Sequence, residues 1–155
     1  MMMQVEFDQI TIVFSEDVMR EFMNYQQSEY NMPEAGGILL GQVKDNYFYI
    51  LKVSTPSKKD TFSRYRFTRD KRTAQKVIDQ EFALSSHKTI YLGEWHTHPE
   101  NYPSPSAQDI NMIKEQFQNN ILNEKLVLMV IVGLKSIYVS YFDGIKLSSL
   151  SLNLT

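Results

Sequence analysis

Apolar and polar positions along the chain follow the periods of strands and helices in turn. Alternating or short apolar runs predict strands over residues 4–14, 38–40, 47–51, 89–97, 126–132, 136–142 and 145–150. Apolar residues at helical spacing predict three intervening helices, over residues 15–29, 68–82 and 106–119. We therefore expect an α+β (α/β-like) fold, in which a central mixed sheet is flanked by helices.

Turn and cap residues connect these elements. Residues 44–46 have the composition of a turn, so the strands 38–40 and 47–51 are expected to form a hairpin. Residues 143–144 also have the composition of a turn, and the last three strands are expected to form an antiparallel meander. Ser15 and Thr68 are expected N-caps of the first two helices. The polar stretch 55–66 is expected to be a loop.

Composition adds limits on chemistry and location. The 155 residues are the size of one domain, so residues 1–155 are expected to fold as a single unit. There is no cysteine, which excludes disulfides, thiolate nucleophiles and Cys-ligated zinc. A net charge of −2 gives no general case for nucleic acid or an anionic membrane. Since neither a signal peptide nor a membrane-spanning apolar run is visible, we expect a cytoplasmic protein.

The chain carries two of its three histidines in the stretch His96-Thr97-His98-Pro99. Residues two apart on a strand share one face, with Cα atoms about 6.5–7 Å apart. Two imidazoles on that spacing can converge on one metal ion at about 2.0–2.1 Å. The pair also has a simpler interpretation, because most His-x-His pairs bind no metal.

A carboxylate follows at the start of the next predicted helix. Ten residues separate His98 from Asp109, which lies three positions after the expected N-cap Ser106. Two histidines and one carboxylate leave a fourth tetrahedral position for water, as in catalytic zinc sites. Taken alone, Ser106 and Asp109 are also a capping-box pair with Asp in place of Glu, and Glu34 is simply a loop residue.

Together these residues resemble the JAMM (MPN+) zinc isopeptidase family, whose signature is an upstream Glu, His-x-His-Pro and Ser-x-x-Asp. Glu34 precedes the glycine-rich segment 35–41, and His96-Thr97-His98-Pro99 and Ser106-Ala107-Gln108-Asp109 stand at the family's spacing. The resemblance covers about residues 5–142. It implies an MPN/JAB-like fold, one zinc ion (Zn2+) per chain, and His96, His98 and Asp109 as its ligands.

The resemblance also implies catalytic roles and a substrate class. Glu34 would be the general base and acid, and Ser106 would stabilise the oxyanion. JAMM enzymes typically hydrolyse the bond after the C-terminal glycine of a ubiquitin-like protein. The stretch 91–99 is similar to proteases encoded beside bacterial E1/E2-like conjugation systems, including those of antiphage (CBASS-type) operons, so the expected partner is a ubiquitin-like protein or its conjugate.

Three alternatives within the same superfamily are left open. A peptidase acting on a small sulfur-carrier protein adduct would use them unchanged. A non-proteolytic MPN-type scaffold usually lacks the ligands. The loop Pro103-Ser104-Pro105-Ser106 is similar to that of the RadC-like branch.

Other residues receive simpler interpretations. Trp95 is expected in the core, Glu94 on the opposite face or strand edge from the ligands, and His87 at an exposed helix end. Basic residues crowd segment 58–76, which we interpret as a solvated face or, more specifically, as a docking site for an acidic partner surface; they are Lys58, Lys59, Arg64, Arg66, Arg69, Lys71, Arg72 and Lys76. A nucleic-acid-binding function would rest on this segment alone, and we do not expect one.

Overall fold

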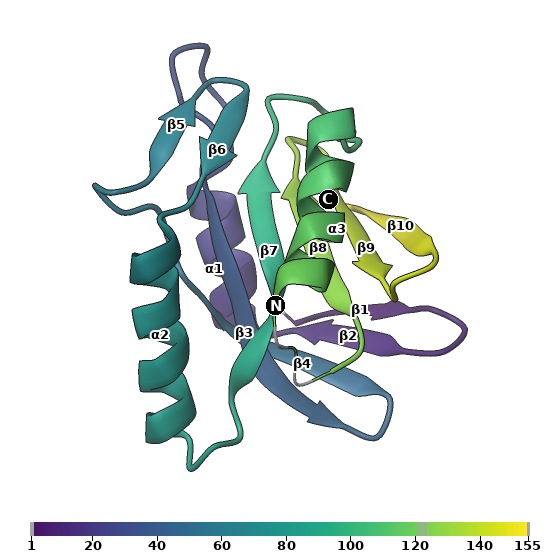
Figure 1. Cartoon of the computed structure of the whole chain (residues 1–155). Coiled ribbons are helices and arrows are strands. Elements are labelled where there is room, and N and C mark those ends of the chain that lie inside the picture. Colours follow the sequence, from purple (N-terminus) through teal and green to yellow (C-terminus); the bar gives the residue numbers. More distant parts are fainter. Residues whose placement is uncertain (1, 121, 123, 155) are drawn as a thin grey trace.

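The computed structural model describes residues 2–120, 122 and 124–154, and its centre is an eight-stranded mixed sheet (Figure 1). The strands occur in the order β1 (Met3–Glu6), β2 (Thr11–Phe14), β4 (Tyr47–Val53), β3 (Gly36–Lys44), β7 (Ile90–Thr97), β8 (Val127–Val132), β9 (Ser136–Phe142) and β10 (Leu147–Asn153). The pairs β2–β4 and β7–β8 are parallel, and the other pairs are antiparallel. The expected mixed sheet and the meander β8–β9–β10 are thus confirmed.

Three helices cover the two faces of the sheet. On one face α1 (Glu16–Asn24) buries Phe22 against Trp95 of β7. On the other face α2 (Lys71–Leu84) packs Ala74 against Ile38 of β3. Beside it, α3 (Ala107–Asn119) packs Ile113 against β8 and β9. The fold is therefore three-layered, with α2 and α3 on the same side of the sheet (Figure 1).

The N-terminal predictions were wrong in two details. The expected strand 4–14 is a hairpin of β1 and β2, because the Phe7 N–H donates to the Ile10 carbonyl across a turn. Both arms carry apolar residues, so the pattern looked continuous. The first helix ends at Asn24 rather than near residue 29, because the Tyr25 N–H turns back to the Phe22 carbonyl.

The stretch expected to be a loop contains a second, small sheet. The strands β5 (Thr61–Ser63) and β6 (Arg66–Thr68) pair antiparallel beyond the end of the main sheet (Figure 1). Thr68 therefore ends a strand and does not cap α2. The N-cap is Asp70, whose side chain accepts a hydrogen bond from the Thr73 N–H at 3.0 Å.

A β-bulge in β7 decides which side chains face the helices α2 and α3. The register between β3 and β7 shifts at Leu39/Leu40, and Gly93 allows β8 to approach so closely that a Cβ atom there would lie 2.0 Å from the Leu128 carbonyl oxygen. Beyond the bulge, Glu94 faces the same side as Tyr91. Within the described residues, no helix is long and apolar enough to cross a membrane.

Candidate metal centre

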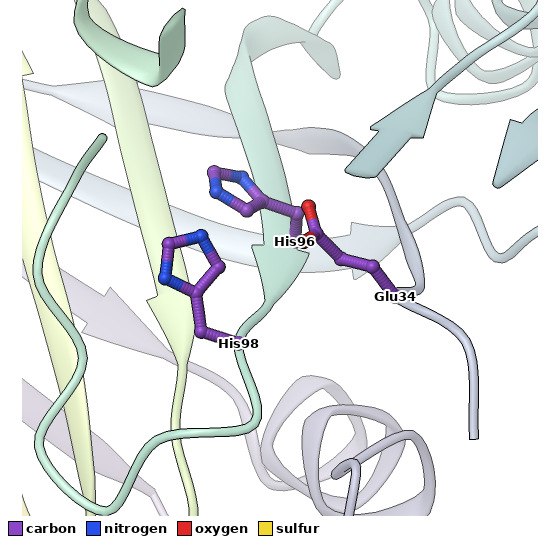
Figure 2. Close-up of side chains that lie close together, drawn as sticks. All are labelled: Glu34, His96 and His98. Atoms are coloured by element: carbon purple, nitrogen blue, oxygen red, sulfur yellow. The ribbon is translucent and has the colours of Figure 1, made fainter. Parts of the chain in front are cut away.

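The two histidines lie where β7 ends against its neighbours. His96 is buried on the face covered by α2 and α3, and His98 follows directly after the last residue of β7. The His98 N–H donates to the Val132 carbonyl of β8 at 3.1 Å. The two imidazole centroids lie 5.0 Å apart, and the Glu34 side chain extends toward the histidines (Figure 2). The predicted pair of converging imidazoles is therefore present in the structure.

Asp109 reaches this pair from the first turn of α3. Its Oδ1 lies 3.2 Å from His96 Nε2, and its Oδ2 lies 3.2 Å from His98 Nε2. The expected capping box is also confirmed: the Ser106 hydroxyl accepts from the Asp109 N–H at 3.0 Å, and the Asp109 carboxylate accepts from the Ser106 N–H at 2.9 Å. The cap thus orients the carboxylate toward both rings. Asp109 can therefore be part of the capping box and a metal ligand at the same time.

Glu34 comes from a part of the chain more than sixty residues away. Gly36 pairs with His96, and the Thr97 N–H donates to the Ala35 carbonyl at 2.9 Å, so the backbone next to Glu34 lies against the end of β7. The side chain is 4% exposed. Burial raises the pKa of Glu34 to about 8, although the nearby His98 opposes this shift. The site therefore contains a buried carboxyl group that can exchange a proton near neutral pH.

A buried polar network, which the sequence analysis did not predict, holds the Glu34 segment in place. The Thr97 hydroxyl accepts from the Ala35 N–H at 2.9 Å and donates to Gln27 Oε1 at 2.8 Å. Gln27 in turn donates to the Arg64 carbonyl at 2.8 Å. Thr97 stands between the two histidines, which was the only available signal for its role.

The charges of the site are strongly coupled. Burial opposes protonation of His98, but the carboxylates of Asp109 and Glu100 outweigh burial and raise its pKa to about 8. Burial alone would raise the pKa of Asp109, yet the adjacent imidazoles of His96 and His98 hold it well below its usual range. A carboxylate that stays ionised between two imidazoles is a suitable donor set for a divalent cation.

Two buried atoms test whether a metal fits here. Among the described residues, His96 Nε2 and Glu34 Oε2 have no hydrogen-bond partner, although Nε2 lies 3.2 Å from Asp109 Oδ1. Such groups normally find a partner. One ligand atom from each of Glu34, His96 and His98 lies within 4.8 Å of the others. The residues therefore fit a metal ion, with either Asp109 or Glu34 as the carboxylate ligand.

Ser106 is exposed at the edge of this cluster. Its oxygen already accepts the Asp109 N–H, so the hydroxyl has used one acceptor position. The hydroxyl hydrogen is not needed for that bond and is free to donate to another group. Capping and a donor role at Ser106 can therefore coexist.

A groove of about 730 Å³ opens beside the cluster. Glu34, His96 and Asp109 line it together with Phe67 of β6 and Asn111 of α3. Figure 1 shows β6 and α3 on either side of β7, and Glu94, Trp95 and His96 of β7 also line the groove.

Comparison with known proteins agrees with this geometry. A family model described as prokaryotic homologs of the JAB domain matches residues 15–142. The chain belongs to this JAB family.

Relatives of this JAB domain include two proteins named CD-NTase/cGAS isopeptidase. The one from Escherichia coli (strain TW11681) is 34% identical over 134 residues, covering 86% of this chain and 83% of the relative. The one from Vibrio cholerae is 32% identical over 127 residues, covering 82% and 79%. A solution structure from Desulfitobacterium hafniense has a TM-score of 0.62 at 18% identity and covers 88% of both chains. That structural likeness concerns the fold alone.

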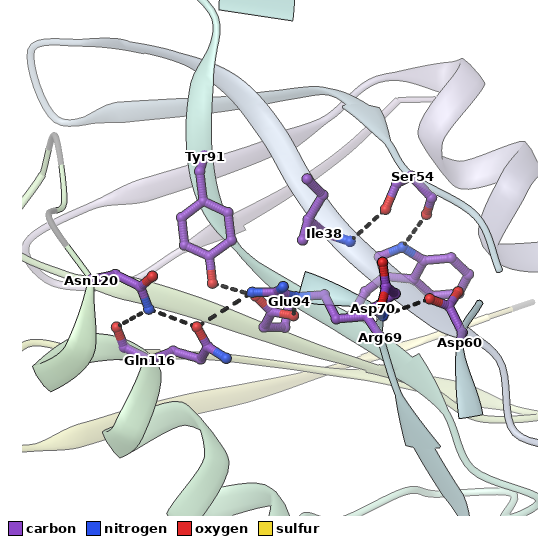
Figure 3. A network of polar contacts seen from close by, with 10 residues as sticks. Ile38, Ser54, Asp60, Arg69, Asp70, Tyr91, Glu94, Gln116 and Asn120 are labelled. Atoms are coloured by element: carbon purple, nitrogen blue, oxygen red, sulfur yellow. Dashed lines mark hydrogen bonds and ion pairs between the residues drawn. The ribbon is translucent and has the colours of Figure 1, made fainter. Parts of the chain in front are cut away.

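The JAB domain also has a buried ion pair that our sequence analysis missed (Figure 3). Arg69 Nε donates to Glu94 Oε1 at 2.7 Å, and a second guanidinium nitrogen lies 3.2 Å from Oε2. Tyr91 donates to the same carboxylate, and Gln116 of α3 accepts from Arg69 at 3.4 Å. Glu94 was expected on the opposite face or strand edge; it instead shares the face of His96 and lines the groove, because residues two apart on β7 point the same way.

The pairing also removes Arg69 from the basic segment 58–76. Lys71, Arg72 and Lys76 remain exposed on α2, so the predicted acidic docking surface would depend on these and neighbouring side chains. Two simpler predictions are confirmed. Trp95 is 1% exposed and donates to the Ser54 carbonyl at 2.9 Å, and His87 is exposed just after α2.

Replacing Arg69 with Ala is expected to lower the free energy of unfolding by about 3–5 kcal/mol, because Glu94 would be left buried and unpaired. The side chains of Arg69 and Glu94 are only 16% and 7% exposed. Removing both charges, with Arg69→Met and Glu94→Gln together, should restore much of the loss. Urea denaturation measures both, with Lys71→Ala as an exposed control. A loss below about 1 kcal/mol for Arg69→Ala would show that the pair is not a stabilising link between β7 and the start of α2.

Proposed function

We propose that this JAB domain is a zinc-dependent isopeptidase. The observation that carries the proposal is the convergence of two imidazoles, an ionised carboxylate and a buried carboxyl group at one groove. The names of the relatives support an isopeptidase, and that of the family supports the JAMM type of site.

His96, His98 and Asp109 would hold the metal. We prefer Asp109 to Glu34 as the carboxylate ligand because it lies 3.2 Å from a nitrogen of each ring. When bound, zinc polarises the scissile carbonyl and lowers the pKa of a water ligand toward about 7. This chemistry needs no cysteine, which agrees with a chain that has none.

Glu34 and Ser106 would complete the reaction. Glu34 takes a proton from the attacking water and passes it to the leaving lysine amine, a role that suits a carboxyl group whose pKa lies near 8. The free hydroxyl hydrogen of Ser106 would donate to the oxyanion that forms on the scissile carbonyl. The network of Thr97 and Gln27 keeps the Glu34 segment beside the histidines.

The substrate we propose is a protein joined through its C-terminal carboxyl group to a lysine. The names of the relatives favour a CD-NTase as the conjugated protein. We expect an E1/E2-like system to make the conjugate, and a conjugate of a ubiquitin-like protein is the other candidate substrate. We expect the C-terminal segment that precedes the bond to bind in the groove beside Glu34, His96 and Asp109. We expect the protein to act in the cytoplasm, as part of an antiphage (CBASS-type) defence system.

The test uses a CD-NTase of the same organism, joined through its C-terminus to the lysine of a fluorescent peptide. We expect release of the peptide with the CD-NTase C-terminus intact, loss of cleavage after chelation and its return with zinc. Parallel reactions contain a ubiquitin-like conjugate and a sulfur-carrier protein adduct. Cleavage of the adduct alone would favour the sulfur-carrier alternative. Binding of all three without cleavage would favour a scaffold and contradict the proposal.

A further inference from the structure

A carboxylate outside the ligand set contacts the far side of the His98 ring. Glu100 Oε1 lies 2.8 Å from His98 Nδ1, while His98 Nε2 faces Asp109 at 3.2 Å. When Nε2 binds a metal it carries no proton, so the remaining ring proton is on Nδ1 and is donated to the Glu100 carboxylate. The short contact with Glu100 therefore favours the neutral tautomer whose Nε2 lone pair faces the metal-binding cluster.

The backbone of Glu100 is fixed even though its side chain is 48% exposed. Its carbonyl accepts from the Leu134 N–H at 2.8 Å, in the turn between β8 and β9. The same turn contains Gly133, where a Cβ atom would lie 2.3 Å from Pro103 and 2.7 Å from the Glu100 carbonyl oxygen. The loop therefore lies tightly against the end of β8, which also anchors the His98 backbone.

We propose that Glu100 is a positioning residue that fixes the His98 tautomer and ring orientation for metal binding. The inference rests on the proposed function, since it assigns His98 Nε2 as a zinc ligand. A hydrogen-bond partner of a ligating histidine orients the ring and increases the basicity of the ligand nitrogen. Losing such a partner typically weakens metal binding by about 10- to 100-fold. Because Glu100 is half exposed and water can replace it, we expect an effect near tenfold.

The first measurement is zinc affinity by competition with a chromophoric chelator. Glu100→Ala should bind zinc about tenfold more weakly than the wild type, and Glu100→Gln, which keeps a neutral acceptor, should lie between them. Glu6→Ala is the matched control, because it removes the same charge from an exposed position on β1. Far-UV circular dichroism checks that each variant is folded.

The second measurement is the His98 tautomer, read from long-range ¹H–¹⁵N correlations of the ring. Above the His98 pKa of about 8 the zinc-free ring is neutral. Under that condition Nδ1 should carry the proton in the wild type, and the ring of Glu100→Ala should populate both tautomers. Equal zinc affinity and an unchanged tautomer in Glu100→Ala would overturn the inference while leaving the proposed function intact. A wild-type protein that binds no zinc would instead overturn the proposed function, and the inference with it.

Discussion

Glu34→Gln is expected to lower the rate of hydrolysis by about 10²- to 10⁴-fold while the protein keeps one zinc ion per chain. The amide has nearly the same shape as the carboxyl group but cannot take up and return a proton. The buried position, the absence of a hydrogen-bond partner for Oε2 among the described residues and the pKa near 8 all favour a proton-transfer role. A peptide-release assay and zinc analysis on the same sample give both quantities.

The control is Glu29→Gln, five residues earlier on an exposed stretch, which should change neither activity nor zinc content. Two outcomes would correct the account in different ways. Loss of zinc from Glu34→Gln would make Glu34 a ligand, the alternative that its 4.8 Å cluster with His96 and His98 leaves open. Unchanged hydrolysis would remove Glu34 from the mechanism.

His98→Ala is expected to lose both the metal and the activity. The variant lacks one of the three proposed zinc ligands. Loss of a residue that only hydrogen-bonds to a ligand weakens metal binding by up to roughly 100-fold, so loss of the ligand itself should lower zinc affinity by more than that. Asp109 would also lose one of the two imidazoles that it contacts at 3.2 Å. Competition with a chelator measures the affinity, and the release assay measures the activity with zinc in excess.

His87→Ala is a matched control, because it removes the same side chain from an exposed position after α2. It should bind zinc and hydrolyse the substrate as the wild type does. If His98→Ala kept wild-type zinc affinity, the ion would be held elsewhere, and the ligand assignment would be wrong even if the protein remained an isopeptidase.

The sequence predicted the parts of the site that depend on local geometry. His96 and His98 converge because strand residues two apart share a face, and Asp109 is oriented by a cap whose residues are three apart. The same local rules predicted the hairpin of β3 and β4 and the meander at the C-terminus. The position of Glu34 came only from the family resemblance, because no spacing rule connects residues more than sixty apart.

The missed features depend on contacts between distant segments. The Thr97 hydroxyl connects Ala35 to Gln27, and Arg69 reaches Glu94 across the start of α2; neither partner can be found from periodicity. Side chains normally alternate between the two faces of a strand, and the bulge in β7 interrupts this alternation. Tyr91 and Glu94 therefore lie on the same face although they are three residues apart. The sequence therefore did not predict hydrogen bonds and ion pairs between polar residues of different elements.

Metal analysis of the freshly purified protein, prepared without chelator, tests the central claim most directly. We expect about one zinc ion per chain in the wild type and in Glu34→Gln, and none in His98→Ala. A wild-type protein that contains no zinc and takes up none on addition would contradict the claim.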